Sequence, residues 1–266
     1  MITISKRRPD RSRVGCTVLC AGVTLKGNGM SDDFLVHDFF EDRLTTKIVS
    51  EVLRTKVGER LPSERDLSRE LNVSRTALRD RLRYLEAVGL LERRSGMGTV
   101  LKELHPKVVS QVLILGFMTS GMTVSSLTPV RIALERQAAR AAAIENDPIR
   151  IAHIESAVRA MEVSSDPQSV FQADVAFHEA VSLASNSRAL IFFSDVLSGV
   201  ISRSVRQRQE RILQLCYDKE RIRSLHRTIY QEVARGNAEG AMTAMDEHFH
   251  YLDELQGISG ITNGRV

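Results

Sequence analysis

Four ionisable side chains in the C-terminal part of the chain fall on helical faces that are otherwise apolar. Asp174 and His178 lie four residues apart on one such face, and His226 and His248 each interrupt another. A polar group in that position loses its water on folding and needs a partner. One carboxylate and three imidazoles that meet in a core could bind one divalent transition metal ion, of which zinc is favoured and nickel or manganese are alternatives. The competing interpretation is that each histidine is hydrogen-bonded on its own.

Two further residues could bind an anion beside such a metal ion. A single carboxylate would leave a divalent ion with net positive charge, so an open coordination position could bind a small carboxylate effector. Arg131, in the segment RIALERQAARAAA, could form a second contact with that anion, or it could instead form a salt bridge with Glu135. Asn186 could line the same pocket or cap a helix.

The elements that would position these residues are all helices. From residue 102 onward every segment has helical periodicity, and none alternates as a strand does. Proline, glycine, asparagine and aspartate separate the periodic segments. The pattern predicts an all-α bundle of six or seven helices, near residues 107–118, 127–145, 148–163, 168–184, 188–213, 218–235 and 238–256.

A smaller unit precedes this bundle. An amphipathic helix is predicted over residues 44–53, and Ser63 and Ser74 can each cap a further short helix. The glycines of the segment SGMG suit the tip of a hairpin. The last of the three helices has leucines on one face, and on another face an arginine at every fourth position: Arg75, Arg79 and Arg83. This order of elements predicts a winged helix-turn-helix whose basic helix enters the major groove of DNA.

One long pattern runs through this unit. It consists of Gly58, Leu61-Pro62-Ser63-Glu64-Arg65, Leu67, Leu71, Val73-Ser74-Arg75-Thr76, Leu78-Arg79, Leu82, Leu85-Glu86, Gly89-Leu90 and a G-x-G-T wing from Gly96 to Thr99. The pattern resembles the GntR superfamily of bacterial transcription regulators. The chain departs from it mildly, with Val57 where proline is usual and Asp80-Arg81 in place of Glu-Ala. The resemblance implies contacts with duplex DNA by Arg65, Ser74, Arg75, Thr76, Arg79 and Gly96.

A second pattern runs through the predicted bundle. It joins Asp174-x-x-x-His178, with Phe177, to Asn186-x-x-x-Leu190 and to the spacing between His226 and His248. From about residue 125 to residue 255 it resembles the FCD effector domain of the FadR-like branch of the superfamily. This resemblance implies a divalent transition metal ion bound by Asp174, His178, His226 and His248.

Charge is unevenly distributed along the 266 residues. Residues 1–29 hold six basic and one acidic side chain, residues 43–101 hold thirteen and eight, and residues 102–266 hold eighteen and nineteen. The basic surplus therefore belongs to the N-terminal part, which suits contact with phosphate at one end only. No apolar run is long enough for a membrane span. Three cysteines without a metal or disulfide pattern indicate a reducing, cytoplasmic setting.

The first 29 residues have some features of a signal peptide. Basic residues precede the apolar run VGCTVLCAGVTL, but the run is short and no cleavage site is clear. We expect instead that Met30 is the natural start, or that residues 1–29 form a disordered arm. A short helix is expected over residues 34–42.

These observations together predict the organisation and function of the chain. We expect a homodimeric DNA-binding regulator, not an enzyme, that grips a near-palindromic operator and responds to a small organic acid. Repression and activation are both open. A metal-dependent hydrolase is one alternative, although no general base is clearly poised near the site, and a purely structural metal is another. The predicted segments are a basic extension (1–40), the winged helix-turn-helix (41–101), a linker and connecting helix (102–123), the metal- and effector-binding dimerisation domain (124–257) and a flexible tail (258–266).

Overall fold

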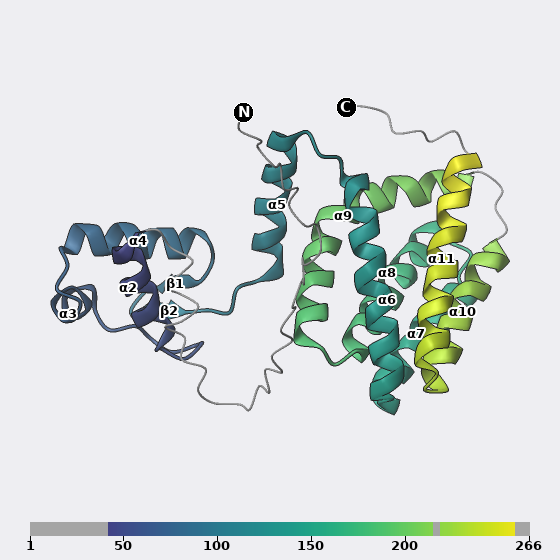
Figure 1. Cartoon of the computed structure of the whole chain (residues 1–266), viewed down its shortest axis with the longest axis horizontal. Coiled ribbons are helices and arrows are strands. Elements are labelled where there is room, and N and C mark those ends of the chain that lie inside the picture. The colour runs from purple at the N-terminus through teal and green to yellow at the C-terminus, as the bar shows by residue number, and fades with distance from the viewer. Residues whose placement is uncertain (1–41, 215–218, 259–266) are drawn as a thin grey trace, which may run out of the picture. The chain divides into compact units, whose positions relative to one another are not determined.

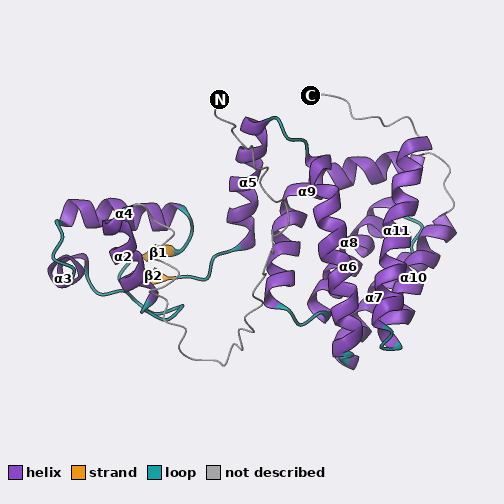
Figure 2. Ribbon diagram, viewed as in Figure 1, coloured by secondary structure: helices purple, strands orange, loops and turns teal. Residues whose placement is uncertain are grey.

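The computed structural model describes residues 42–214 and 219–258, which are mainly helical with one two-stranded sheet (Figures 1 and 2). The predicted fold class, an N-terminal winged helix-turn-helix followed by an all-α domain, is confirmed. Contacts between Cα atoms group the chain into two compact units, residues 1–54 and 55–266. No helix among the described residues is long and apolar enough to cross a membrane.

The described part of the first unit is α2 (Arg43–Leu53). Asp42 caps this helix, because its carboxylate accepts hydrogen bonds from the first backbone amides, at 3.1 Å from Leu44 N. The apolar stripe predicted to face inward is the buried one, with Ile48 and Val52 only 1% and 2% exposed. The expected arm over residues 1–40 and nearly all of the expected helix over 34–42 lie outside the described residues.

The helix-turn-helix consists of α3 (Glu64–Glu70) and α4 (Arg75–Ala87). Ser63 and Ser74 cap the two helices as predicted, each with its hydroxyl oxygen 3.2 Å from a backbone amide nitrogen of the first turn. Asn72 has a φ of 52°, a left-handed conformation that asparagine tolerates and that reverses the chain between the helices. The leucines of both helices are buried, which leaves the arginines of α4 on the solvent side.

The wing is an antiparallel hairpin of β1 (Leu91–Arg94) and β2 (Gly98–Leu101). The sequence did not predict the short segment that pairs with the other edge of β2, where Arg60 bridges Val100 and the Leu61 amide donates to the Thr99 carbonyl at 2.8 Å. Gly98 has a φ of 86°, and a Cβ there would lie 2.7 Å from Arg60 Nε. The positive φ favours glycine at this position of the wing, whereas the end of the Arg60 side chain could shift to make room for a Cβ.

Five helices share one large apolar core in the C-terminal domain (Figure 1). Alanines line the inner face of α6, with Ala138, Ala139, Ala142 and Ala143 at most 2% exposed, so α8, α10 and α11 can approach it closely. The large side chains of this core include Phe177, Ile154 and Met245. The five helices are α6 (Thr128–Glu145), α7 (Pro148–Val163), α8 (Pro167–Ala184), α10 (Lys219–Ala234) and α11 (Ala238–Ile258).

A second apolar cluster joins α5 (Pro106–Ser120), the short helix η1 (Val124–Leu127) and α9 (Arg188–Gln214). The hydroxyl of Ser110 donates to the carbonyl of Val196 at 2.8 Å, and a Cβ at Gly199 would lie 2.5 Å from that hydroxyl oxygen. The small residue at 199 therefore permits the close packing of α5 on α9. All seven helices predicted from residue 107 onward are present, with ends within two residues of the expected positions.

Candidate metal centre and DNA-reading surface

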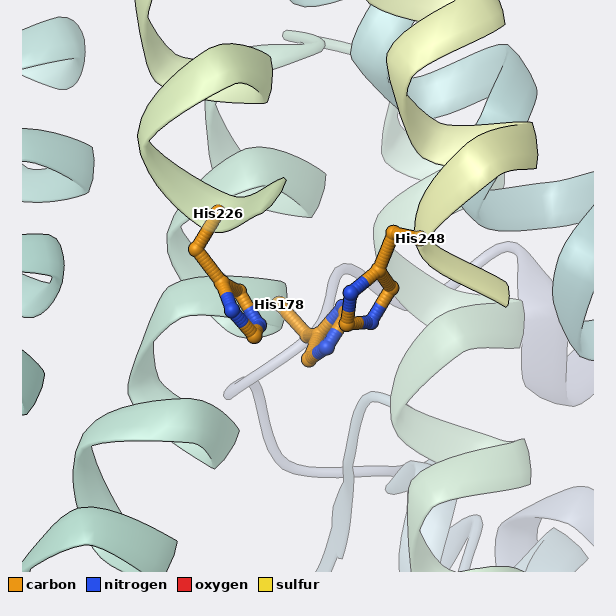
Figure 3. Close-up of side chains that lie close together, drawn as sticks. All are labelled: His178, His226 and His248. Carbon is orange, nitrogen blue, oxygen red and sulfur yellow. The ribbon is translucent and has the colours of Figure 1, made fainter. Parts of the chain in front are cut away.

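Three histidines from three helices converge inside the C-terminal bundle. His178 of α8, His226 of α10 and His248 of α11 point toward one another (Figure 3). One ring nitrogen of each lies within 4.8 Å of those of the other two. His226 and His248 are 0% and 1% exposed, so the packing of the helices holds them together.

Asp174 is the fourth residue of this cluster. Its Oδ1 lies 3.1 Å from His226 Nε2 and 3.8 Å from His178 Nε2. Burial on its own would raise the pKa of Asp174, but the hydrogen bond with His226 and the attraction of the neighbouring histidines outweigh it and hold the pKa below its usual range. The cluster therefore contains an ionised carboxylate, which suits a cation site.

The donor atoms of the cluster suit a divalent transition metal ion. His226 Nδ1 lies 2.9 Å from the Ile222 carbonyl oxygen and can donate to it, which would leave Nε2, on the side of Asp174, to bind a metal ion. Both ring nitrogens of His248 are buried without a hydrogen-bond partner in the described part of the chain. Burial, reinforced by the two other histidines, lowers the pKa of His248 well below its usual range. A neutral imidazole of this kind needs a partner that accepts electron density, and a metal ion is such a partner.

Glu135 of α6 is the residue of this site that the sequence pattern did not reveal. One carboxylate oxygen lies against His178 Nδ1, and the other accepts a hydrogen bond from Arg131 Nε at 2.5 Å. Burial would raise the pKa of Glu135, but Arg131 and His178 lower it to about 2. In the segment RIALERQAARAAA, Glu135 suggested only a salt bridge to Arg131. Its approach to α8 depends on how two helices pack, which the segment alone does not reveal.

A cavity of about 710 Å³ lies beside this cluster, between α5, α6, α8 and α9. Asp174 and His178 line it on the metal side, together with Arg131 and Glu135. His105, the cap of α5, lines it at the end of the segment that follows the wing. The cavity therefore reaches from two of the predicted metal ligands to the helix that follows the DNA-reading unit in sequence.

The two residues predicted to bind an effector lie in different places. Arg131 lines the cavity and also forms the salt bridge with Glu135, so the two interpretations of this residue are compatible. Asn186 is exposed in the turn between α8 and α9, with a φ of 53° and its amide 3.1 Å from Glu145 Oε2. It is not among the residues that line the cavity, and its expected contact with an effector stays a prediction.

The predicted DNA contacts lie on one unit but have different settings. Arg75 and Thr76 are exposed in the first turn of α4, next to the cap Ser74. Arg65 is exposed at the start of α3, and Gly96, with a φ of 76°, forms the exposed tip of the wing. Arg79 differs from the others because Glu64 accepts hydrogen bonds from its Nε and Nη2.

Comparison with known proteins decides the family. The model of the bacterial regulatory proteins of the gntR family matches residues 38–101, and that of the FCD domain matches residues 126–251. The HTH-type transcriptional regulator LutR of Bacillus subtilis (strain 168) is 31% identical over 202 residues, which cover 75% of this chain and 92% of that protein. The chain belongs to the GntR family.

Other relatives support the assignment of the chain to the GntR family. A protein of Escherichia coli (strain K12) named for regulation of the L-lactate dehydrogenase operon is 28% identical over 201 residues, 74% of this chain and 78% of its own. The solved structure of Streptococcus agalactiae GntR has a TM-score of 0.58 at 23% identity, covers 80% of this chain and 98% of its own, and supports the fold. The relatives are transcriptional regulators, which confirms that the GntR regulator binds DNA and is not an enzyme.

Proposed function

We propose that this GntR regulator binds a divalent transition metal ion, with zinc favoured, through Asp174, His178, His226 and His248. A small 2-hydroxy acid then binds at that ion, and its binding changes the affinity for an operator. The observation that supports the proposal most directly is the convergence of three histidines and a carboxylate beside a cavity, with Asp174 and His178 on the cavity wall. Three imidazoles and one carboxylate are ligands that zinc accepts, and a coordination position open to the cavity suits an effector.

The cavity wall favours an acid as the ligand. A bound divalent ion would supply positive charge that one carboxylate ligand does not neutralise. Arg131 has a side chain 19% exposed and lines the same cavity, where its guanidinium can bind a carboxylate through two parallel hydrogen bonds. Glu135 already occupies the Nε edge of this arginine, so the remaining N–H groups are the ones available to an acid.

The class of acid is inferred from one relative. A protein 28% identical to this chain is named for the L-lactate dehydrogenase operon, and the substrate of that enzyme is a 2-hydroxy acid. A 2-hydroxy acid can present its carboxylate and its hydroxyl to one metal ion, which matches a site with an open coordination position. L-lactate is therefore the first ligand to test, with glycolate as a smaller member of the class.

Binding in the cavity can influence DNA affinity through α5. The first turn of α5 and its cap contribute His105, Pro106 and Lys107 to the cavity wall, and only residues 102–104 separate them from β2 of the wing. Farther along, the Ser110 hydroxyl anchors α5 to α9. A ligand that binds one position of this first turn more tightly shifts the regulator toward that position. The resulting change in operator affinity cannot exceed the ligand's own difference in affinity for the two positions.

At the DNA end, we propose that α4 reads the major groove. Two copies of the chain would place two such helices on successive half-sites of a near-palindromic operator, about one helical turn apart. Arg75 and Arg79 can recognise guanine, whereas Arg65, at the start of α3, is better placed to contact phosphate than a base.

The metal proposal is tested by the metal content of purified protein. We expect about one zinc ion per chain in the wild type and loss of most of it in His226→Ala, because the variant removes a fully buried ligand. His250→Ala is the matched control, since His250 is on α11 but its side chain is 76% exposed. Equal metal content in wild type and His226→Ala would overturn the assignment of the site.

A further inference from the structure

Glu64 connects three elements of the DNA-reading unit. It is the first residue of α3, and its Oε2 accepts hydrogen bonds from Arg79 of α4, at 3.1 Å from Nε and 3.0 Å from Nη2. Its Oε1 lies 3.3 Å from Nη2 of Arg93 on β1, the first strand of the wing. One carboxylate thus contacts the arginines of both the recognition helix and the wing.

The geometry of the contact with Arg79 leaves one edge of the guanidinium for another partner. Glu64 occupies the edge formed by Nε and Nη2, whereas guanine is recognised through two parallel N–H groups such as those of the Nη1 and Nη2 edge. The Glu64 side chain is 23% exposed and that of Arg79 is 47% exposed, so the carboxylate is the more fixed partner. The pair holds a long, flexible side chain in one orientation.

A carboxylate on this surface also opposes binding to DNA in general. Each positive side chain that contacts phosphate adds affinity that does not depend on sequence, and a negative charge beside it reduces that affinity. Without Glu64, Arg79 would be able to turn toward the nearest phosphate, whereas Arg93 would keep its ion pair with Glu86. Glu64 therefore costs general affinity and restricts Arg79 to an orientation that reads a base, a combination that favours selectivity.

We propose that Glu64 is a positioning residue that sets the sequence selectivity of this regulator by orienting Arg79. The inference rests on the proposed role of α4 in reading the major groove. It adds a residue that contacts no DNA itself but determines how the reading side chain is presented.

The test compares Glu64→Gln with Glu86→Gln in the full-length protein. Glu86 is the matched control because it lies on α4 and pairs with Arg93 at 3.2 Å, so its substitution changes the charge equally without releasing Arg79. Binding is measured by fluorescence anisotropy on a duplex of about 30 base pairs selected from a random library by the wild type, and on a scrambled duplex of the same composition. The readout is the dissociation constant for the scrambled duplex divided by that for the selected duplex, at several salt concentrations.

We expect Glu64→Gln to bind the scrambled duplex more tightly and to reduce the ratio by about tenfold or more, whereas Glu86→Gln leaves the ratio within about twofold. Glu64→Asp, which keeps the carboxylate, should retain more selectivity than Glu64→Gln at a similar melting temperature. Equal ratios in Glu64→Gln and Glu86→Gln would overturn the inference. Equal loss of selectivity in Glu64→Gln and Glu64→Asp would also overturn it.

A further variant separates this inference from the proposal on which it rests. Arg79→Ala should weaken binding to the selected duplex much more than binding to the scrambled one. If Arg79→Ala affects both duplexes equally, the proposed reading role of Arg79 fails and the role of Glu64 fails with it. If Arg79→Ala is selective but Glu64→Gln is not, only the inference about Glu64 is wrong.

Discussion

Glu135 lies against the Nδ1 edge of His178, so that the Nε2 of the same ring faces Asp174. This arrangement of carboxylate, imidazole and proposed metal ion fixes which nitrogen of His178 carries the proton. Arg131 in turn balances the charge of Glu135. The metal site and the proposed effector contact are therefore linked through one buried carboxylate.

The first prediction concerns Glu135→Gln. We expect the affinity for zinc to fall by about 10–100-fold, because a neutral amide orients the His178 ring and supports its basicity less well than a carboxylate. The measurement is competition with a chelator of known affinity. Glu145→Gln is the control, since Glu145 is on the same helix but its partner is the exposed Asn186. Unchanged zinc affinity in Glu135→Gln would show that His178 is oriented without Glu135.

Phe177 supports the same site by packing. It is 0% exposed, and its ring meets those of His178 and His226 edge to face, with centroids 5.3 and 4.7 Å away. We expect Phe177→Ala to lower the free energy of unfolding by about 3–5 kcal/mol in denaturant titrations, because it leaves a cavity in the core. Phe193→Ala, at a position 53% exposed, should change it by no more than about 0.5 kcal/mol. Similar small effects for both would mean that Phe177 does not support the core.

The proposed effector contact gives a separate prediction. Arg131→Lys keeps the positive charge but loses the planar fork, so we expect the affinity for L-lactate to fall by about 10–100-fold while the zinc content stays the same. Calorimetric titration of zinc-loaded protein gives the affinity. Arg140→Lys is the control on the same helix, where the arginine contacts the exposed Glu239 at 3.3 Å. Wild-type affinity in Arg131→Lys would remove this residue from the effector site.

The helix that carries Asp174 and His178 has a pH-sensitive cap. Hydrogen bonds from the Ser169 hydroxyl, at 2.6 Å, and from its amide lower the pKa of Asp166 below the ordinary 3.8. Because the folded-state pKa is the lower one, this contribution to stability is fully present above about pH 3.8 and is lost as the pH falls through the folded-state value. We expect Asp166→Ala to be less stable than the wild type at pH 7, with a difference that shrinks in acid. A difference independent of pH would exclude an ionised cap.

The sequence was sufficient to predict the helices and the meeting of Asp174, His178, His226 and His248, for reasons visible in the residues. Asp174 and His178 share one apolar helical face, and His226 and His248 each interrupt another. Because a core must satisfy each polar group that it contains, the four side chains were expected to find partners there. Periodicity also located the helix ends, since proline and capping residues stand at most of them.

The contacts between distant segments could not be predicted in the same way. Glu135 reaches His178 only because α6 packs against α8, and Glu64 reaches Arg93 across 29 positions of the chain. Neither glutamate interrupts a pattern, since a charged residue on a partly exposed helical face is ordinary. Asn186 shows the opposite case, because its place in a matching pattern suggested a pocket residue, whereas the turn after α8 sets its exposed position.

An acid bound at the proposed metal site is expected to change the affinity of the regulator for DNA. The most direct test measures the anisotropy of the selected duplex during titration with L-lactate, for zinc-loaded protein and for protein stripped by a chelator. We expect a change of about fivefold or more in the dissociation constant of the zinc-loaded protein and no change in the stripped protein. An equal change in both samples, or none in the zinc-loaded protein, would contradict this expectation.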